Sequence, residues 1–150
     1  MDRYEATIAL ISAHPGIAQF ADFGHGTPDR RIQEAEQEIG FSLPASYKWW
    51  LRHYSGGEVG GEEIYSVYED ASNPAPGGDI VYMHRMHCNS GAHLEHQLVI
   101  CHSDIDGVFY FDATALDEDG EYPVASAATG RRYASNFLEF LSKRIKLFAG

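Results

Sequence analysis

Apolar side chains recur every three or four residues in four segments of the chain, a spacing typical of helices that bury one face. These segments are residues 4–13, 28–39, 44–54 and 136–148. Thr27 is expected to cap the second segment, with Pro28 in its first turn and Gly40 at its end. The pattern therefore predicts three helices in the N-terminal third and one at the C-terminal end.

Between these helices the pattern changes to short runs rich in β-branched and aromatic residues, at 64–68, 80–83, 98–101, 108–111 and 122–124. Pro123 has no amide hydrogen, so the last run is expected to be an edge strand or its start. Asp106-Gly107 and Asp119-Gly120 are typical of turns, and residues 73–78 of a loop. The order predicts an α+β fold, with a mainly antiparallel sheet of about five strands on which the N-terminal helices and the C-terminal helix pack.

The chain has 150 residues, of which 44% are hydrophobic, enough for one domain with a substantial core. We expect a single domain over 1–150, with 1–27 as a flanking helix and loop and 28–146 as the core. No apolar run reaches the roughly 20 residues that span a bilayer, and the first residues lack a signal-peptide pattern. Cys88 and Cys101 are too few for a disulfide framework. These features predict a soluble, cytoplasmic protein without a membrane partner.

Acidic residues outnumber basic ones by 22 to 11, which gives a net charge of −11. Such a chain repels phosphate backbones, so direct nucleic-acid binding is not expected. The imbalance is concentrated in residues 53–130, where fourteen acids accompany Arg85 as the only Lys or Arg. This acidic middle is suited to attract a cationic protein.

Two groups of acids in this region are candidates for contact with a basic partner. They are Glu58, Glu62, Glu63, Glu69 and Asp70 around the first predicted strand, and Asp117, Glu118, Asp119 and Glu121 around a predicted turn. On loops and strand ends these carboxylates should be solvated. Trp49, about 100° around its helix from Trp50, is the candidate aromatic anchor. The alternatives are simple solubility for the acids and a half-buried place at the edge of the core for Trp49.

Many of the apolar landmarks occur in a recognisable order. They are Ile32, Glu36, Ile39-Gly40, Leu43-Pro44, Tyr47, Trp50-Leu51 and Tyr54-Ser55-Gly56-Gly57, followed by residues 98–100, 106–112, 123–124 and 137–141. Over roughly residues 28–146 they resemble the SUKH superfamily of Smi/Knr-like domains. The resemblance implies an α+β fold and, for most bacterial members, an immunity protein that binds and neutralises a cognate toxin, often a nuclease. Other relatives act as interaction modules or cell-wall regulators.

Histidine and cysteine are concentrated in residues 84–102, which contain five of the eight histidines and both cysteines. Imidazole and thiolate are the ligands that zinc prefers, so the alternative site is a metal centre at His84, His87, Cys88, His93 and His96, with Cys101 and His102 nearby. There is no Cys-x-x-Cys pair, and the two His-x-x-His pairs would lie side by side only on helices. The segment is otherwise expected to be a polar connector between strands, or a set of imidazoles whose protonation near pH 6 reduces the local negative charge.

No nucleophile elbow, phosphate-binding loop or His-Glu-x-x-His motif is present. A calcium loop with Gly120 as its sixth residue would need ligands at Ala115 and Ser126, which cannot supply them as required. We therefore expect a non-enzymatic immunity protein without a cofactor, a monomer or weak homodimer, that binds a cognate toxin, a basic nuclease domain, through its acidic surface. The alternatives are a metal-binding protein or metallo-hydrolase using residues 84–102, and a general regulatory interaction module.

Overall fold

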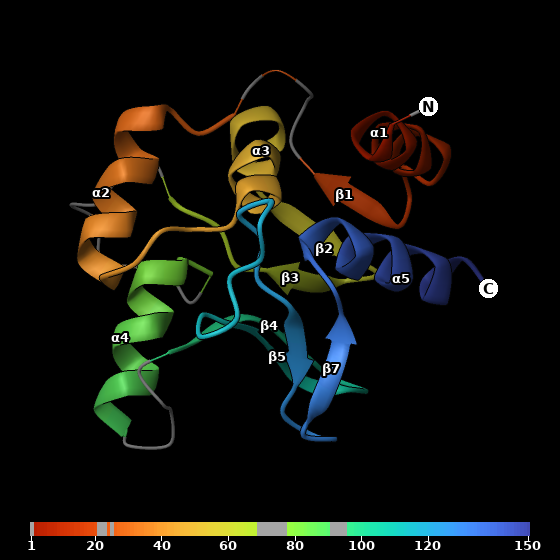
Figure 1. Ribbon diagram of the computed structural model, residues 1–150. Coiled ribbons are helices and arrows are strands. Elements are labelled where there is room, and N and C mark those ends of the chain that lie inside the picture. Colours follow the sequence, from red (N-terminus) through yellow and green to blue (C-terminus); the bar gives the residue numbers. More distant parts are fainter. Residues whose placement is uncertain (1, 21–23, 25, 69–77, 91–95) are drawn as a thin grey trace.

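The computed structural model describes residues 2–20, 24, 26–68, 78–90 and 96–150 (Figure 1). The helices are α1 (Arg3–Ala13), α2 (Asp29–Ile39), α3 (Ala45–Tyr54), α4 (Ile80–Ser90) and α5 (Phe137–Ala149). The strands are β1 (Ala18–Phe20), β2 (Gly57–Val59), β3 (Glu62–Ile64), β4 (Gln97–Ser103), β5 (Gly107–Asp112), β6 (Val124–Ser126) and β7 (Arg131–Ala134). The expected α+β fold is confirmed.

The strands form one sheet in chain order, and each pair of neighbours is antiparallel. It has seven strands where the sequence predicts about five, because β1, β2 and β7 have only three or four residues and contain no apolar run. Gly60 and Gly61, with φ of 60° and 84°, form the turn between β2 and β3. Only positive φ at both positions gives the turn twist that matches two short antiparallel strands, which favours glycine.

The prediction of a strand at 80–83 is wrong, since these residues begin α4. Asp79 caps this helix, accepting the amide hydrogen of Tyr82 at 3.0 Å, and the buried residues Ile80, Val81 and His84 share one helical face. A short apolar run does not by itself distinguish a strand from a buried helical turn. The Asp79 cap and the packing against α2 favour the helix at these residues.

Three element boundaries also differ from expectation. β3 ends at Ile64, so residues 65–68 continue past the strand. Pro123 precedes β6, which lies between β5 and β7, so the run 122–124 is the start of an interior strand and not of an edge. Pro28, not Thr27, is the N-cap of α2, because Thr27 lies against α3, where its amide donates to the carbonyl of Leu51 at 2.7 Å.

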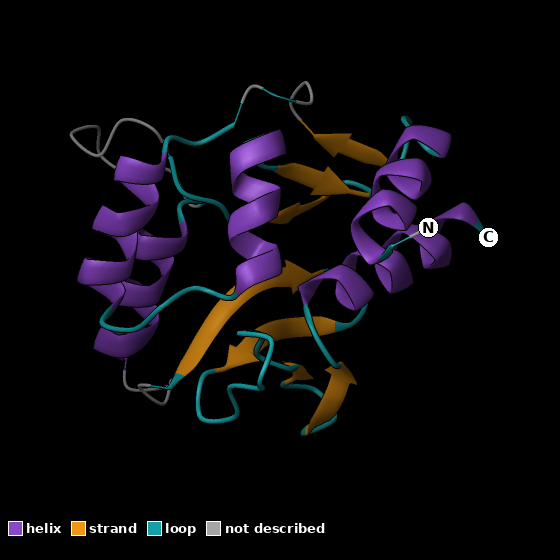
Figure 2. Ribbon diagram, turned by 45° about the horizontal axis from the view of Figure 1, so that its top comes forward, coloured by secondary structure: helices purple, strands orange, loops and turns teal. Residues whose placement is uncertain are grey.

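The core lies between the sheet and helices α3 and α5. Tyr47 and Trp50 of α3 are fully buried, and their rings contact Phe137 at centroid distances of 5.1 and 5.3 Å. Phe140 of α5 packs on Phe109 of β5 at 5.3 Å. In both ribbon views α2 and α4 lie side by side, and α3 stands between that pair and the pair formed by α1 and α5 (Figures 1 and 2). The first twenty residues add α1 against α5 and β1 beside β2.

Candidate functional site

Two glutamates lie directly opposite each other on neighbouring short strands. In the antiparallel pairing of β2 with β3, Glu58 is the partner of Glu63, and Val59 is the partner of Glu62. Val59, Glu62 and Ile64 face the core, so Glu58 and Glu63 project from the other face of the sheet. We call this pair the acidic row. Among the described residues neither carboxylate has an ion-pair partner.

Tyr68 extends the acidic row with a hydroxyl group. Its phenol donates a hydrogen bond of 3.0 Å to Oε2 of Glu63. Burial, and then the Glu63 carboxylate, raises the pKa of Tyr68 to about 12. The hydroxyl therefore keeps its proton at neutral pH and acts as a hydrogen-bond donor. The row is thus a pair of carboxylates, one of which is oriented by a neutral phenol.

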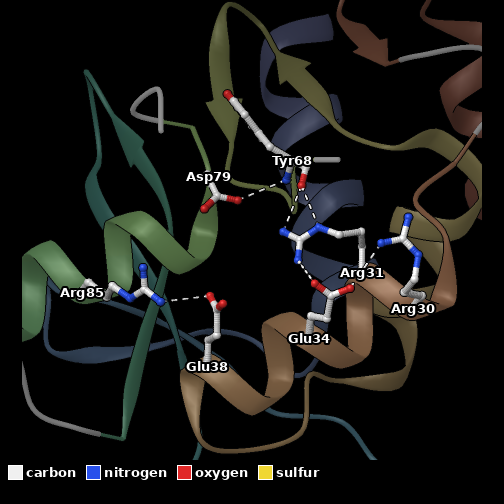
Figure 3. A network of polar contacts seen from close by, with 7 residues as sticks. All are labelled: Arg30, Arg31, Glu34, Glu38, Tyr68, Asp79 and Arg85. Carbon is white, nitrogen blue, oxygen red and sulfur yellow. Dashed lines mark hydrogen bonds and ion pairs between the residues drawn. The ribbon is translucent and has the colours of Figure 1, made fainter. Parts of the chain in front are cut away.

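Buried polar contacts fix the backbone of Tyr68 (Figure 3). Arg31 of α2 donates to the Tyr68 carbonyl through Nε at 3.2 Å and Nη2 at 3.0 Å, and Asp79 accepts the Tyr68 amide at 3.1 Å. The Arg31 side chain is almost fully buried, and its third guanidinium nitrogen, Nη1, forms an ion pair with Glu34 at 3.0 Å. This cross-link holds the segment after β3 between α2 and the start of α4, so the phenol position is set by the fold.

The second candidate group, Asp117, Glu118 and Asp119, which we call the acidic turn, is exposed. The Asp117 carboxylate accepts the amides of Asp119 at 2.8 Å and Glu121 at 3.0 Å. The turn is attached to the start of α3, where the Ala45 amide donates to the Gly120 carbonyl. Since β2 follows the end of this ten-residue helix, the acidic turn and the acidic row are separated by roughly the 15 Å length of α3. The structure therefore does not join them into one cluster.

The expectation that Glu62 and Glu121 are solvated is wrong. Glu62 is 8% exposed, and Arg144 of α5 pairs with its Oε1 at 2.7 Å while the Ser103 hydroxyl donates to its Oε2. Glu121 is 0% exposed and accepts both the amide and the hydroxyl of Ser46 at the start of α3. Each carboxylate is buried because a distant element supplies a cation or hydrogen-bond donors to it. Both belong to the interior and not to a contact surface.

The pKa of Glu121 predicts a pH-dependent stability term. Burial raises this pKa above the ordinary value of 4.5, against the hydrogen bonds of Ser46 and the Arg3 guanidinium 3.6 Å away. The folded state therefore holds the proton more tightly than the unfolded chain, and the resulting stability is present below pH 4.5 and lost as the pH rises through the folded-state pKa. We expect the stability of Glu121→Gln relative to the wild type to increase as the pH rises above 4.5. Urea unfolding of both proteins measures this, and a constant difference across that range would contradict it.

Trp49 is half-buried at the edge of the core. Its ring contacts Tyr4 of α1 at 4.9 Å, and it also lies against His53 and Tyr54 of its own helix. These contacts attach α1 to α3. A role for Trp49 as a partner anchor stays a prediction, and Glu69 and Asp70 lie outside the described residues.

The His/Cys segment is divided between a helix and the sheet. His84, His87 and Cys88 lie on α4, with Cys88 Sγ 3.6 Å from Nε2 of His84. Burial, and then His87, lowers the pKa of His84. Cys101 is buried in β4, where burial raises its pKa to about 12, and His96 precedes that strand. His93 is not described, and within the described ranges no three His, Cys, Asp or Glu side chains are grouped as metal ligands.

Sequence reasoning did not identify Arg31 and Arg144, the two buried arginines on which the site and the sheet depend. A signal was present for Arg31, since it occupies the apolar face of α2 beside Ile32 and Ala35. Arg144 likewise shares the buried face of α5 with Leu141 and Ile145. A buried cation on an apolar helical face needs a carboxylate or carbonyl partner, but the sequence does not indicate which residue provides it.

An open antiparallel sheet in chain order, covered by helices on its core side, defines the class of α+β domain to which this chain belongs. A solved structure described as a protein from Pseudomonas syringae pv. tomato has the same fold, with a TM-score of 0.59, 15% identity and coverage of 89% of this chain and 94% of that one. Residues 26–143 match the SMI1 / KNR4 family (SUKH-1), and the chain belongs to that family. The family includes immunity-type proteins and is generally non-catalytic.

A search of curated proteins finds no relative that matches the chain. Over the part of the chain that the structure describes, no helix is both long enough and apolar enough to cross a membrane.

Proposed function

We propose that this protein is an immunity protein that binds and neutralises a basic toxin domain, a nuclease, through its acidic surface. The observation that carries the proposal is the acidic row, where Glu58 and Glu63 lie opposite each other without a neighbouring cation among the described residues. Like charges in this position destabilise a sheet. The chain belongs to a family that includes immunity-type proteins. This supports the hypothesis that a cationic partner protein relieves the repulsion between Glu58 and Glu63.

The acidic turn is the second part of the proposed surface. Its three exposed carboxylates have no ion-pair partner among the described residues, and the Gly120 carbonyl that follows them accepts the Ala45 amide at the start of α3. A partner that covers both the row and the turn would span roughly the length of α3. Glu62 and Glu121 are excluded from this surface because they are buried.

A single neutralised charge in the acidic row is expected to stabilise the free domain. Glu58→Gln removes the repulsion with Glu63 and should raise the free energy of unfolding by about 0.2–1 kcal/mol. Glu118→Gln, which neutralises an exposed acid of the turn, is the control and should leave stability within about 0.5 kcal/mol of the wild type. Urea unfolding at low ionic strength gives both values. A Glu58→Gln protein less stable than the wild type would show that the two glutamates are not in conflict.

The function itself is tested by capture and rescue. The tagged chain is used to capture proteins from a lysate of its source organism, and bound proteins are eluted with increasing salt, which screens contacts between exposed charges. We expect one basic polypeptide, bound by the wild type and by a Glu5→Lys/Asp104→Lys control, but not by Glu58→Lys/Glu63→Lys. The two variants change the net charge equally, so only the location of the change distinguishes them.

The captured polypeptide is then expressed in bacteria with and without the chain. We expect it to prevent growth alone and to be harmless when the chain is present, with its nuclease activity blocked in the purified complex. A captured protein that is harmless by itself would favour the regulatory interaction module instead. Equal capture by both charge-reversed variants would remove the acidic row from the interface.

A further inference from the structure

The basic residues of this acidic chain are distributed unevenly between paired and unpaired positions. Of the eleven Lys and Arg residues, seven form ion pairs with carboxylates. Among the residues that the structure describes, the remaining four have no such partner: Arg131, Arg132, Lys143 and Lys146. The chain has 22 acids, yet these four cations, all within residues 131–146, form no ion pair with them among the described residues.

Three of these four cations line one hollow of about 750 Å³. The hollow lies between the β4–β5 turn, the β6–β7 turn and α5. In the strand register, Arg131 of β7 lies opposite Ser126 of β6, and Ser126 lies opposite Phe109 of β5. Because Phe109 contacts Phe140 of α5, Arg131 lies on the side of the sheet that faces α5. Lys143 stands over the ring of Tyr133 at 4.3 Å and donates to the Tyr133 carbonyl at 2.6 Å. We call this site the basic hollow.

Among the described residues that line the basic hollow, Asp106 supplies the one carboxylate, and that group is already engaged. Asp106 pairs with the buried Arg144 at 2.6 Å, so it does not neutralise the cations at the opening. Its walls also include apolar surface, because Phe109 lies beneath and Ile105 is 67% exposed at the rim. A volume in this range is typical of sites that accept a ligand or an anchoring side chain.

An open sheet edge lies beside the basic hollow. Among the described strands β7 is the last of the sheet and pairs with β6 alone, so its other edge carries no strand, and its Tyr133 carbonyl accepts from Lys143. Such an edge can accept an extended segment of another protein by backbone hydrogen bonds, while side chains enter adjacent pockets. The cations and the exposed isoleucine then define which side chains fit.

We propose that the basic hollow and the β7 edge bind an extended acidic segment of a partner protein, with carboxylates at Arg131, Arg132 and Lys143 and an apolar side chain against Ile105. The site has the opposite charge to the acidic row and lies on other elements, so this inference does not rest on toxin binding. The overall charge of −11 repels an acidic segment, and only a local site of the opposite sign can overcome that repulsion.

The test uses NMR of the ¹⁵N-labelled full chain titrated with the peptide acetyl-Glu-Leu-Asp-Glu-Phe-Asp-amide. We expect saturable shifts below about 1 mM peptide, confined to residues 105–109 and 126–133 and to the Lys143 region of α5. Arg131→Gln should weaken binding by up to about fivefold, while Lys146→Gln, which removes an unpaired cation outside the hollow, should not. Replacing Leu and Phe of the peptide with Ser should also weaken binding, because it removes the apolar side chains that contact Ile105; unchanged affinity would exclude that contact.

Three results would overturn the proposal. Shifts that are absent at 1 mM peptide, or equal in Arg131→Gln and Lys146→Gln, would leave the edge cations with the role of preventing strand-to-strand aggregation. Saturable shifts of the same residues with ATP, but not with the peptide, would make the hollow a nucleotide site. The same shifts with inorganic phosphate alone would indicate a simple anion site.

Discussion

Replacement of Arg144 with alanine is expected to lower the free energy of unfolding by about 3–5 kcal/mol. Arg144 is 2% exposed and connects three parts of the fold, pairing with Glu62 of β3 at 2.7 Å and Asp106 of the β4–β5 turn at 2.6 Å, and donating to Ser103 of β4 at 3.1 Å. Burial opposes its charge, but hydrogen bonds with Asp106, Tyr133 and Glu62 raise its pKa above the ordinary value. Without the guanidinium, the Glu62 carboxylate is left buried and uncompensated.

Two matched variants separate this effect from loss of packing. Lys146→Ala, on the exposed side of the same helix, should change stability by less than about 0.5 kcal/mol. Arg144→Met/Glu62→Gln removes both charges and keeps an acceptor for Ser103, so it should recover part of the stability lost in Arg144→Ala. Urea unfolding of the full chain measures all three. An Arg144→Ala protein within 1 kcal/mol of the wild type would show that Glu62 is solvated when the arginine is absent.

Replacement of Trp50 with alanine is expected to cost a similar amount, about 3–5 kcal/mol. Trp50 is 0% exposed, and its ring lies 5.3 Å from both Phe20 and Phe137 and 5.9 Å from Tyr47. Truncation opens a cavity where β1, α3 and α5 meet, and the surrounding rings fill it only in part.

Trp50→Phe provides the informative comparison. The indole N–H has no hydrogen-bond acceptor among the described residues, and a buried donor without a partner is itself destabilising. Phenylalanine keeps most of the ring contacts and removes that donor, so its cost should be clearly smaller than that of alanine. Thermal and urea unfolding of the two variants test this. Equal losses would indicate that the indole N–H contributes a stabilising contact.

Four of the five described helices, α1, α2, α3 and α5, are predicted from the sequence because their signals are local. Asn136 caps α5 through the Glu139 amide at 2.9 Å, and Gly40 ends α2 at φ of 100°. The family was also accessible, since its landmarks are core positions of α2, α3 and β5 in a fixed order. The run at 80–83 is not recognisable as a helix from the sequence, because its apolar length suits both a strand and a helical turn and α4 is capped by the side chain of Asp79.

The candidate site was predictable only in part. The sequence indicated an acidic surface, and the structure retains Glu58, Glu63 and the acidic turn as exposed or half-exposed carboxylates. It could not show that Glu58 and Glu63 are cross-strand partners, since β2 is too short to be recognised. The basic hollow is not predictable from the sequence for a related reason: Lys143 lies 11 and 12 positions after Arg132 and Arg131, and these cations meet only when α5 packs beside β7.

By itself, the sequence determined the helical faces, the α+β class, the family and the excess of acid in residues 53–130. These properties follow from neighbouring residues and from composition, both of which are present before the chain folds. Only the tertiary structure decided which charges are buried, because the partner of Glu62 lies 82 residues away at Arg144 and that of Glu121 lies 75 residues away at Ser46. A carboxylate enters the interior when folding supplies a cation or a set of donors to it, and remains at the surface when folding supplies neither.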